Sequence, residues 1–553
     1  MHRNEFKVIF IGIGLLISLI AQAQKQGTKV IYSLNSNGQP IENQQLTLIN
    51  TGNTSSVHYN DDTPDRFIDF DRQTIVKTLI TEVDTVKVST PWSDLESAEI
   101  GSETETLLGY PCKKAKLSLY SNQIEVWFTD SLGQVGSPYT SVMPNYGLVL
   151  KVVRNGNFEI TATSVEQISP ASPLFPLEKI KEVTESEFNA LQIKSRYTTI
   201  PVFHDEKINF GDSIVNPEGD MPNQTYRYSR GTVILKKVAL PRPDNDQVFV
   251  DLSVRSDGDA YDRSGSVFIL TDTSGMLKAL RFGLDQLPVY VVNDSAIYQG
   301  IVANESYTPP LELMRFFTSF GVGHFNEKVI IAGYQWSDSC VYRQEVTSLM
   351  GDLPDEVWIG VFIGNYAQNG HQVSLALNYY PGEENLSNKT WTYPIFNTLN
   401  IMEMSEQNYA TLFLFDSLRV TIDIPEHLKN LRLYFTTTGH GGWGNGDEFN
   451  PKVNEVFMDD TLIFQHIPWR SDCATYRLMN PASGNFSNGL SSSDLSRSNW
   501  CPGTPTPPFI IPLGQVKPGR HTFKVAIPMG SPEGGSFSAW NVSGILVGEV
   551  SSE

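Results

Sequence analysis

Residues 248–270 read "VFVDLSVRSDGDAYDRSGSVFIL", and this stretch decides how the chain folds. Apolar and polar side chains alternate over "VFVDLSVRS", as they do in a β-strand with one buried face. The later run "SVFIL" is apolar throughout, which suits a strand inside a sheet. The bend between the two strands is charged, although glycine and asparagine would turn the chain at lower cost. Its charged residues are Asp257, Asp259, Asp262 and Arg263.

The same alternation recurs along most of the chain. Runs such as "TVILKKVALP", "VWIGVFIGNY", "LRVTIDIPE" and "LRLYFTTTG" are separated by turn-forming residues. Regular spacing of such runs predicts an all-β chain of antiparallel sandwiches or jelly rolls. Helical periodicity is clearest in "TESEFNALQIKS" (184–195), where Thr184 and Glu187 fit a capping box.

Two seams divide the chain into β-rich blocks. The proline-bearing "SPASPLFPLEKI" (169–180) is typical of a linker, and "YYPGEENLSNKT" (379–390) separates two blocks of strands. The predicted divisions are an N-terminal β-rich domain at 24–180, a linker with a short helix at 181–197, and two β-domains at 198–383 and 384–553.

The first 23 residues have the features of a secretory signal peptide. A short basic stretch precedes an apolar run from Val8 to Ile20, and Ala21 and Ala23 bracket a cleavage site. The apolar run is shorter than the roughly 20 residues that span a bilayer, which favours cleavage over a membrane anchor. We expect removal of residues 1–23 and export of the mature chain to the periplasm or the medium.

Charge and cysteine content limit the partners. The 61 acidic and 41 basic residues give a formal net charge of −20. Nucleic acids and anionic membranes attract basic surfaces, so neither is an expected partner, and the mature protein is expected to be a soluble monomer.

Among four cysteines, Cys473 and Cys501 enclose a polar loop. In an oxidising compartment a disulfide between them would stabilise the fold by ~3–4 kcal/mol in the loop-closure model.

Polar clusters lie at three strand ends. The first is the charged bend, the second is "TTTGHGGWGNGDEFNPKVNEVFM" (436–458), and the third is "SDLSRSNWCPG" (493–503). The residues of the second and third clusters that can carry chemistry are His440, Asp447, Glu448, Arg497, Trp500 and Cys501.

Glu448 and Asp262 are the candidate acid and base. A carboxyl half-buried beside an aromatic ring, as Glu448 is beside Phe449, can have a raised pKa, while a more solvated partner such as Asp262 stays ionised. Two carboxylates that face one bond can hydrolyse it without a metal. The alternative is that both belong to acidic turns that cap strand ends.

Metal and cofactor sites are not expected. The oxygen-rich segments "DGDAYD" and "GNGDEFN" do not fit an EF-hand loop. The nine histidines form no His-His or His-x-His pair, and HExxH is absent, which argues against zinc or copper. GxSxG and CxxC motifs are absent as well.

These clusters, in this order, resemble the peptide:N-glycosidase F family, bacterial amidases that remove whole N-glycans from asparagine. The resemblance begins near residue 198 and rests on "GDAYDRSGSVFIL", "LELMRFFTSFGVG", "TTTGHGGWGNGDEF" and "WCPG". It implies two adjacent antiparallel jelly-roll sandwiches with the active site between them, and no cofactor. The implied substrates are N-glycosylated peptides and glycoproteins.

The resemblance also implies roles for individual residues. Asp262 corresponds to the principal catalytic aspartate and Glu448 to the essential glutamate. Asp262 would activate or position water at the amide carbonyl. The implied substrate-binding residues are Tyr261, Arg263, His440, Arg497 and Trp500, with Arg263 supporting Asp262, and the implied disulfide joins Cys473 and Cys501.

Departures from the family pattern lead to a specificity hypothesis. Two cysteine pairs of the best-known member are absent, and Gly258, Gly446 and Asn450 stand at aligned positions. In "FIGNYAQNGHQVSLALNYYPG", Gly364 aligns with a glutamate of that member's site. The missing side chain opens space beside the first N-acetylglucosamine, and we hypothesise that core α1,3-fucose is tolerated there.

The N-terminal domain resembles a different group, the GLPGLI-type exported proteins of unknown function. The similar pieces are "LLGYPCKKAKL", "IEVWFTD", "GSPY" and "MPNYGLVLKV", in which Cys112 and Trp127 are expected to be packing residues. We expect a β-rich accessory domain that gates the cleft.

Two rival functions are a non-catalytic glycan-binding surface protein and a copper-dependent monooxygenase on a paired jelly-roll fold.

Overall fold

The structure is a computed structural model. The predicted signal peptide, residues 1–23, lies outside its described residues. These are 27–60, 65–81, 83–142, 146–169, 177–211, 214–241, 246–271, 275–294, 296–382, 389–441, 446–482, 492–529 and 538–550.

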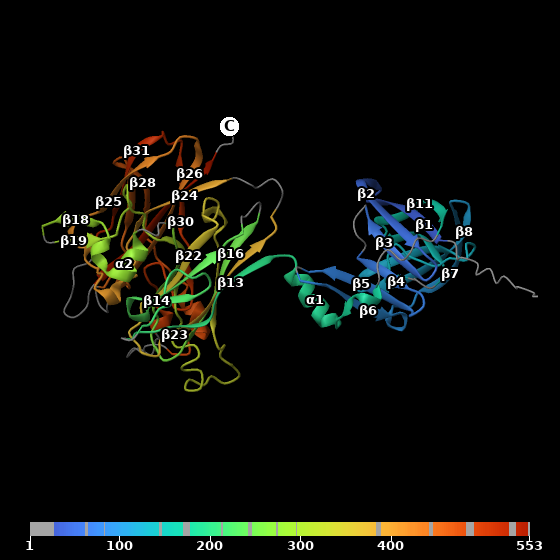
Figure 1. The fold of residues 1–553 in the computed structure, drawn as a ribbon, viewed down its shortest axis with the longest axis horizontal. Helices are drawn as coiled ribbons and strands as arrows, with labels where there is room; N and C mark the ends of the chain where they lie inside the picture. Colours follow the sequence, from blue (N-terminus) through green and yellow to red (C-terminus); the bar gives the residue numbers. More distant parts are fainter. Residues whose placement is uncertain are drawn as a thin grey trace, which may run out of the picture. The chain divides into compact units, whose positions relative to one another are not determined.

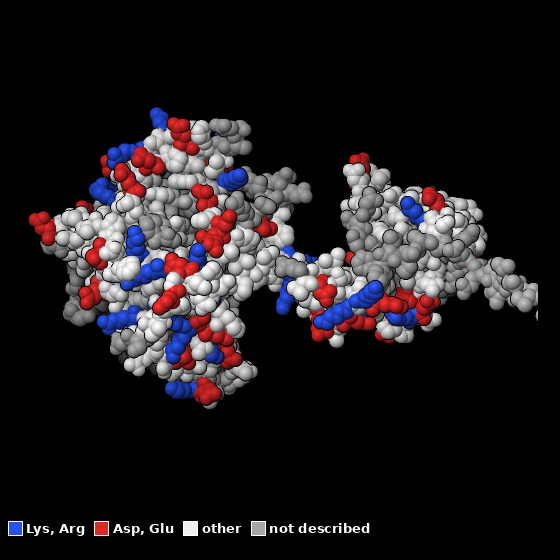
Figure 2. Space-filling model, in the orientation of Figure 1, with Lys and Arg blue, Asp and Glu red and all other residues white. Residues whose placement is uncertain are grey.

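The chain is mostly β, with 53% strand and 10% helix, which confirms the predicted all-β class. It divides into two compact units, Met1–Ser195 and Arg196–Glu553. Among the described residues, no helix combines the length and apolar character needed to cross a membrane. On the face drawn in Figure 2, the described lysines and arginines lie among acidic residues.

The N-terminal unit is built on one 12-stranded sheet (Figure 1). Its strand order is β12-β6-β5-β4-β3-β2-β1-β11-β10-β9-β8-β7. Cys112 and Trp127 are buried in its main core beside Val30 and Tyr32, so both are packing residues as expected. The strands are β1 Gly27–Ser36, β2 Gln39–Asn50, β3 Thr54–Tyr59, β4 Arg66–Asp69, β5 Thr74–Ile80, β6 Thr85–Pro91, β7 Glu99–Leu107, β8 Tyr110–Leu119, β9 Asn122–Thr129, β10 Leu148–Arg154, β11 Phe158–Ile168 and β12 Lys181–Glu182.

The predicted helix forms as α1, Glu185–Lys194, with the predicted capping box. The Thr184 hydroxyl accepts from the Glu187 amide at 3.2 Å, and the Glu187 carboxylate accepts from the Thr184 amide at 2.9 Å. The segment predicted as a linker nevertheless packs on the N-terminal unit. β12 pairs with β6, and Phe188 of α1 is buried against Val86 and Val88, because these apolar side chains leave water together.

The C-terminal unit contains four main sheets (Figure 1). In the first sandwich, β13-β23-β16-β21 faces β14-β15-β22-β17-β20-β29, and in the second, β24-β32-β26-β30 faces β25-β31-β27-β28. The elements are β13 Thr198–Ile208, β14 Thr225–Tyr228, β15 Val233–Ala239, β16 Gln247–Ser256, β17 Ser264–Leu270, α2 Met276–Phe282, β18 Val289–Asn293, β19 Ala296–Gln299, β20 Leu311–Phe317, β21 Cys340–Glu345, β22 Glu356–Ile363, β23 His371–Tyr380, β24 Thr390–Asn397, α3 Leu412–Phe415, β25 Leu418–Ile424, β26 Leu428–Gly441, β27 Asn454–Met458, β28 Thr461–His466, β29 Pro505–Thr506, β30 Phe509–Gly514, β31 Gly519–Ala526 and β32 Ser538–Val550.

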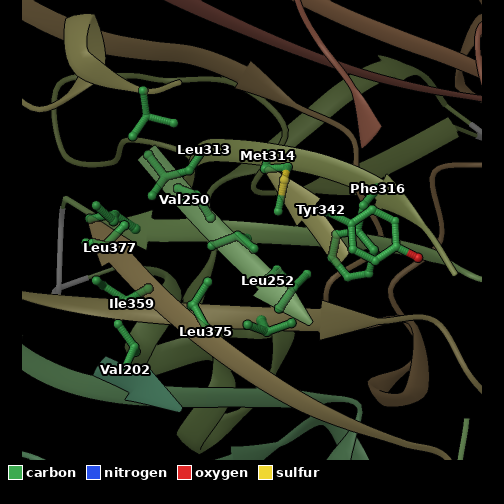
Figure 3. Packing of buried hydrophobic residues seen from close by; sticks show 14 of the residues in the cluster. Val202, Val250, Leu252, Leu313, Met314, Phe316, Tyr342, Ile359, Leu375 and Leu377 are labelled. Atoms are coloured by element: carbon green, nitrogen blue, oxygen red, sulfur yellow. The ribbon is translucent and has the colours of Figure 1, made fainter. Parts of the chain in front are cut away.

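Because apolar and polar residues alternate along its strands, the first sandwich has an interior filled with apolar side chains. Val250 and Leu252 of β16 lie beside Leu375 of β23 and face Met314 and Ile359 of the opposite sheet (Figure 3). Side chains two residues apart share a face of a strand, so the pattern in the opening stretch places these residues inside.

The two sandwiches pack against each other. Tyr434 of β26 and Ile545 and Val547 of β32 belong to the second sandwich, yet they join the core of the first. A buried polar contact crosses the same boundary, because the Arg315 guanidinium donates to the Asn541 carbonyl at 2.6 Å. Residues from both sandwiches can therefore meet in one fixed site.

Candidate active site

The charged bend connects β16 to β17 and is anchored on both sides. The Asp257 amide donates to the Gly370 carbonyl at 2.8 Å, and the Arg263 amide donates to the Thr318 hydroxyl at 2.8 Å. Gly258 has φ +146°, and a Cβ there would collide with Asn369, so only glycine fits. These contacts hold Asp262 at one end of the first sandwich.

Glu448 follows β26 of the second sandwich. Its carbonyl accepts from the Ser498 amide at 3.0 Å, which ties it to the segment that carries Arg497. Arg497 and Arg470 exchange backbone hydrogen bonds of 2.8 and 3.0 Å. The predicted disulfide between Cys473 and Cys501 is present and closes this part of the chain.

Arg497 joins the two carboxylates. Its Nη1 donates to Asp262 Oδ2 at 3.0 Å and to Glu448 Oε1 at 2.9 Å. The Arg497 residue is 1% exposed, and its guanidinium lies over the rings of Phe449 and Trp500, at 5.2 and 4.3 Å from their centres. One buried cation is therefore shared by two acidic side chains from different sandwiches.

Burial raises the pKa of both carboxyls. It brings the pKa of Glu448 to about 8, with the negative charge of Asp262 adding to the rise and Arg497 opposing it. Burial also raises the pKa of Asp262, again against the charge of Arg497. The expectation that Asp262 is the more solvated partner is wrong, because its side chain is 14% exposed and that of Glu448 is 18% exposed.

Arg263 binds a different carboxylate from the one expected. Its Nε and Nη2 donate to the two oxygens of Asp259 at 2.8 and 3.2 Å, and Asp259 is 2% exposed. The Arg263 guanidinium lies 5.0 Å from the ring centre of Tyr261 and 5.2 Å from that of Tyr366. Both tyrosines are more than half exposed, so they form an accessible aromatic surface beside Asp262.

Trp500 is buried and His440 is partly buried. Trp500 stacks on Phe317 with ring centres 4.2 Å apart, and its indole donates to the Gly439 carbonyl at 3.0 Å. His440 Nε2 lies 2.9 Å from the Thr438 hydroxyl, and burial together with Arg315 and Arg497 lowers its pKa to about 3. Trp500 therefore packs against the Arg497 guanidinium and has no ring face exposed to solvent.

Gly364 directly follows β22. Its amide donates to the Ser264 carbonyl at 3.0 Å. A Cβ at Gly364 would lie 3.4 Å from the Phe362 ring and 3.5 Å from the Ser264 hydroxyl, which are ordinary contacts. The backbone therefore accepts a side chain here, and the sequence supplies none.

Three residues near the site are not among the site residues predicted from the sequence. Asp259 was assigned no role, although its spacing of four residues from Arg263 is a usable signal. Glu403 of the second sandwich accepts from the Tyr366 hydroxyl at 2.8 Å. His371 is fully buried opposite Ser256, and burial lowers its pKa to about 4. Neither Glu403 nor His371 lies in a recognisable motif.

Among the described residues, one group offers metal-ligand atoms within 4.8 Å of one another, namely Asp472, Cys473 and Cys501. The two sulfur atoms are joined in the disulfide and are not available as thiolates. The arrangement of Asp262, Glu448 and Arg497 instead suits general acid–base hydrolysis, since two coupled carboxyls can divide one proton between them.

Comparisons with known proteins identify relatives of this chain. The N-terminal model of peptide-N-glycosidase F matches residues 199–379, and its C-terminal model matches 408–547. The model of an N-glycanase peptide N-terminal domain matches 30–188, while the GLPGLI-type resemblance stays a prediction. No curated protein matches the chain.

Two solved structures of PNGF-II are 41% identical to this chain. The structure in space group C2 has a TM-score of 0.87 and covers 96% of this chain and 99% of its own. The structure in space group P21 has a TM-score of 0.85 and covers 95% of this chain and 100% of its own.

The buried carboxyl of Glu448 predicts a pH-dependent stability. Its pKa rises from about 4.5 to about 8 on folding, so the folded state binds the extra proton and loses stability as the pH rises through that window. His371 and His440 act in the opposite direction but only below about pH 6.5, because folding lowers their pKa values. Between pH 6.5 and 8, Tm should therefore fall in the wild type and stay flatter in Glu448→Gln.

Thermal unfolding at several pH values checks this, with Glu426→Gln at an exposed carboxylate as the control. The control should keep the wild-type slope of Tm against pH. A wild-type slope in Glu448→Gln would contradict the assignment of a protonated, buried Glu448.

Proposed function

Because the chain belongs to the peptide-N-glycosidase F family and is an N-glycan amidase, we propose that Asp262 and Glu448 perform its reaction around Arg497. The bond to be hydrolysed is the asparagine side-chain amide, between the carbonyl carbon Cγ and the nitrogen Nδ2 that carries C1 of the first N-acetylglucosamine. The substrates are glycopeptides and glycoproteins. The products are an aspartyl peptide and a glycosylamine.

The observation that carries the proposal is the shared contact of Arg497 Nη1 with Asp262 and Glu448, at 3.0 and 2.9 Å. Burial brings the pKa of Glu448 to about 8, so its carboxyl can hold a proton near neutral pH. Asp262 is then the base that removes a proton from the attacking water. Glu448 returns a proton to the departing nitrogen as the carbon–nitrogen bond of the amide breaks.

Charge develops on the carbonyl oxygen when water attacks. Arg497 lies beside both carboxylates and is enclosed by protein, where a fixed cation stabilises an oxyanion more strongly than it does in water. Arg263 is fixed by Asp259 and faces the exposed rings of Tyr261 and Tyr366. We assign this surface to the sugar, because aromatic rings and guanidinium groups offer flat faces and hydrogen-bond donors.

The rival predictions fit these features less well. A non-catalytic glycan-binding protein has no need of two buried carboxyls with raised pKa values around one guanidinium. A copper enzyme would need ligands that these residues do not provide.

Substitution at Asp262 tests the assignment. Asp262→Asn keeps the size of the side chain and removes the base, so kcat for glycopeptide hydrolysis should fall at least about 100-fold, the lower end of general-base contributions. Mass spectrometry of a denatured glycoprotein measures the loss of the glycan. Tm should stay within a few degrees of the wild type, and a variant with substantial residual rate would refute the role of Asp262.

We further propose that the site accepts core α1,3-fucose. The support is Gly364, where the backbone tolerates a side chain but none is present. Tyr366 stands two residues further on, and its hydroxyl bond to Glu403 holds it in place. A sugar on the 3-hydroxyl of the first N-acetylglucosamine would occupy the space that Gly364 leaves.

The fucose proposal predicts a selective effect of filling that space. Gly364→Glu should lower kcat/KM for α1,3-fucosylated glycopeptides by about tenfold or more, because a clash costs more than ~1.4 kcal/mol. The same variant should retain activity on unfucosylated glycopeptides, and Gly364→Ala should resemble the wild type. Wild-type release of unfucosylated glycans only would overturn the proposal.

Export is a separate proposal, supported by the signal-like residues 1–23. N-terminal sequencing of the mature protein, with Gln24 expected first, tests it. We also propose that the enzyme acts as a monomer.

A further inference from the structure

Asp447 is a buried acid for which the proposed reaction has no use. It precedes Glu448 directly and is 0% exposed. An ionised carboxylate removed from water is costly unless it is paired and hydrogen-bonded. Its retention beside a catalytic residue therefore needs a structural or functional reason.

The side chain of Asp447 is bound within the second sandwich. The indole Nε1 of Trp540 donates to its Oδ2 at 2.8 Å, and Lys452 Nζ lies 3.8 Å from its Oδ1. Trp540 is on β32 and is among the largest fully buried side chains. A rigid, packed ring thus holds the carboxylate in one place.

The backbone of Asp447 is bound as well. Its amide donates to the Ser538 hydroxyl at 3.2 Å, and its carbonyl accepts from the Ser498 hydroxyl at 2.5 Å. The Ser498 amide in turn donates to the Glu448 carbonyl, and Ser498 follows Arg497. Asp447, Glu448, Arg497 and Ser498 therefore form a closed ring of contacts.

Position is transmitted from Asp447 to Glu448 through one peptide bond. Consecutive Cα atoms are held about 3.8 Å apart, so fixing one residue limits the other. The glutamate that must meet Arg497 at 2.9 Å comes directly after a glycine-rich sequence.

We propose that Asp447 is a positioning residue: through the Trp540 indole and the Ser498 hydroxyl, it holds the Glu448 carboxyl against Arg497. The inference rests on the proposed catalytic role of Glu448. Asp447 itself does not touch the substrate.

Truncation of Asp447 should reduce turnover and leave substrate binding nearly intact. Asp447→Ala should lower kcat by about 10- to 100-fold, because a displacement of ~1 Å can cost that much. KM should change by less than about threefold, and the limb of the pH–rate profile that reports Glu448 should shift. Trp540→Phe keeps a ring and removes the donor, so it should act in the same direction.

Two controls separate positioning from a general loss of stability. Asp447→Asn retains an oxygen that accepts from the indole and should stay near the wild-type kcat. Asp459→Asn alters an exposed carboxylate that binds His521 on the same sandwich and should change nothing. On a Glu448→Gln background, measured with enough enzyme to detect the residual turnover, Asp447→Ala should cause no further loss of kcat, since both act through one group.

Failure of this inference can be told from failure of the proposed function. An inactive wild type, or a fully active Glu448→Gln, would overturn the catalytic assignment. An active wild type, an inactive Glu448→Gln and unchanged kcat and pH profile in both Asp447→Ala and Trp540→Phe would overturn the positioning role alone. A lower Tm with unchanged kcat per folded molecule would overturn it in the same way.

Discussion

The site depends on the guanidinium of Arg497. Asp262 and Glu448 are both buried, and two negative charges at this depth would repel each other without a cation between them. Arg497 Nη1 meets both at hydrogen-bond distance, while Trp500 and Phe449 pack against its guanidinium. The result is a pair of neighbouring carboxyls that can share one proton, an arrangement that suits general acid–base catalysis.

The packing of the two sandwiches makes that contact possible. Asp262 and Arg497 are separated by 235 residues along the chain and still meet at 3.0 Å. Tyr434, Ile545 and Val547 extend the core of the first sandwich into the second, so the two cannot move independently without exposing apolar surface. Burial of apolar residues away from the site thus fixes the geometry of the charged residues within it.

Local patterns predicted the local structure well. Period-two alternation identified the strands, and the capping box identified α1. Pairings between distant residues escaped prediction, because a sequence does not show which arginine reaches which carboxylate. Arg263 therefore pairs with Asp259, and Arg497 pairs with Asp262. The expected difference in solvation between Asp262 and Glu448 proved wrong. The burial of Phe188 against Val86 and Val88 of β6 is another such distant pairing.

A direct measurement of the Glu448 pKa by carboxyl-carbon NMR tests the central claim that Asp262 and Glu448 form one coupled pair. In the wild type, Glu448 should titrate near pH 8, because burial and the charge of Asp262 both favour its protonated form. In Asp262→Asn the pKa of Glu448 should fall, since that charge is gone. An ordinary glutamate pKa in the wild type, or the same raised value in both proteins, would contradict the account.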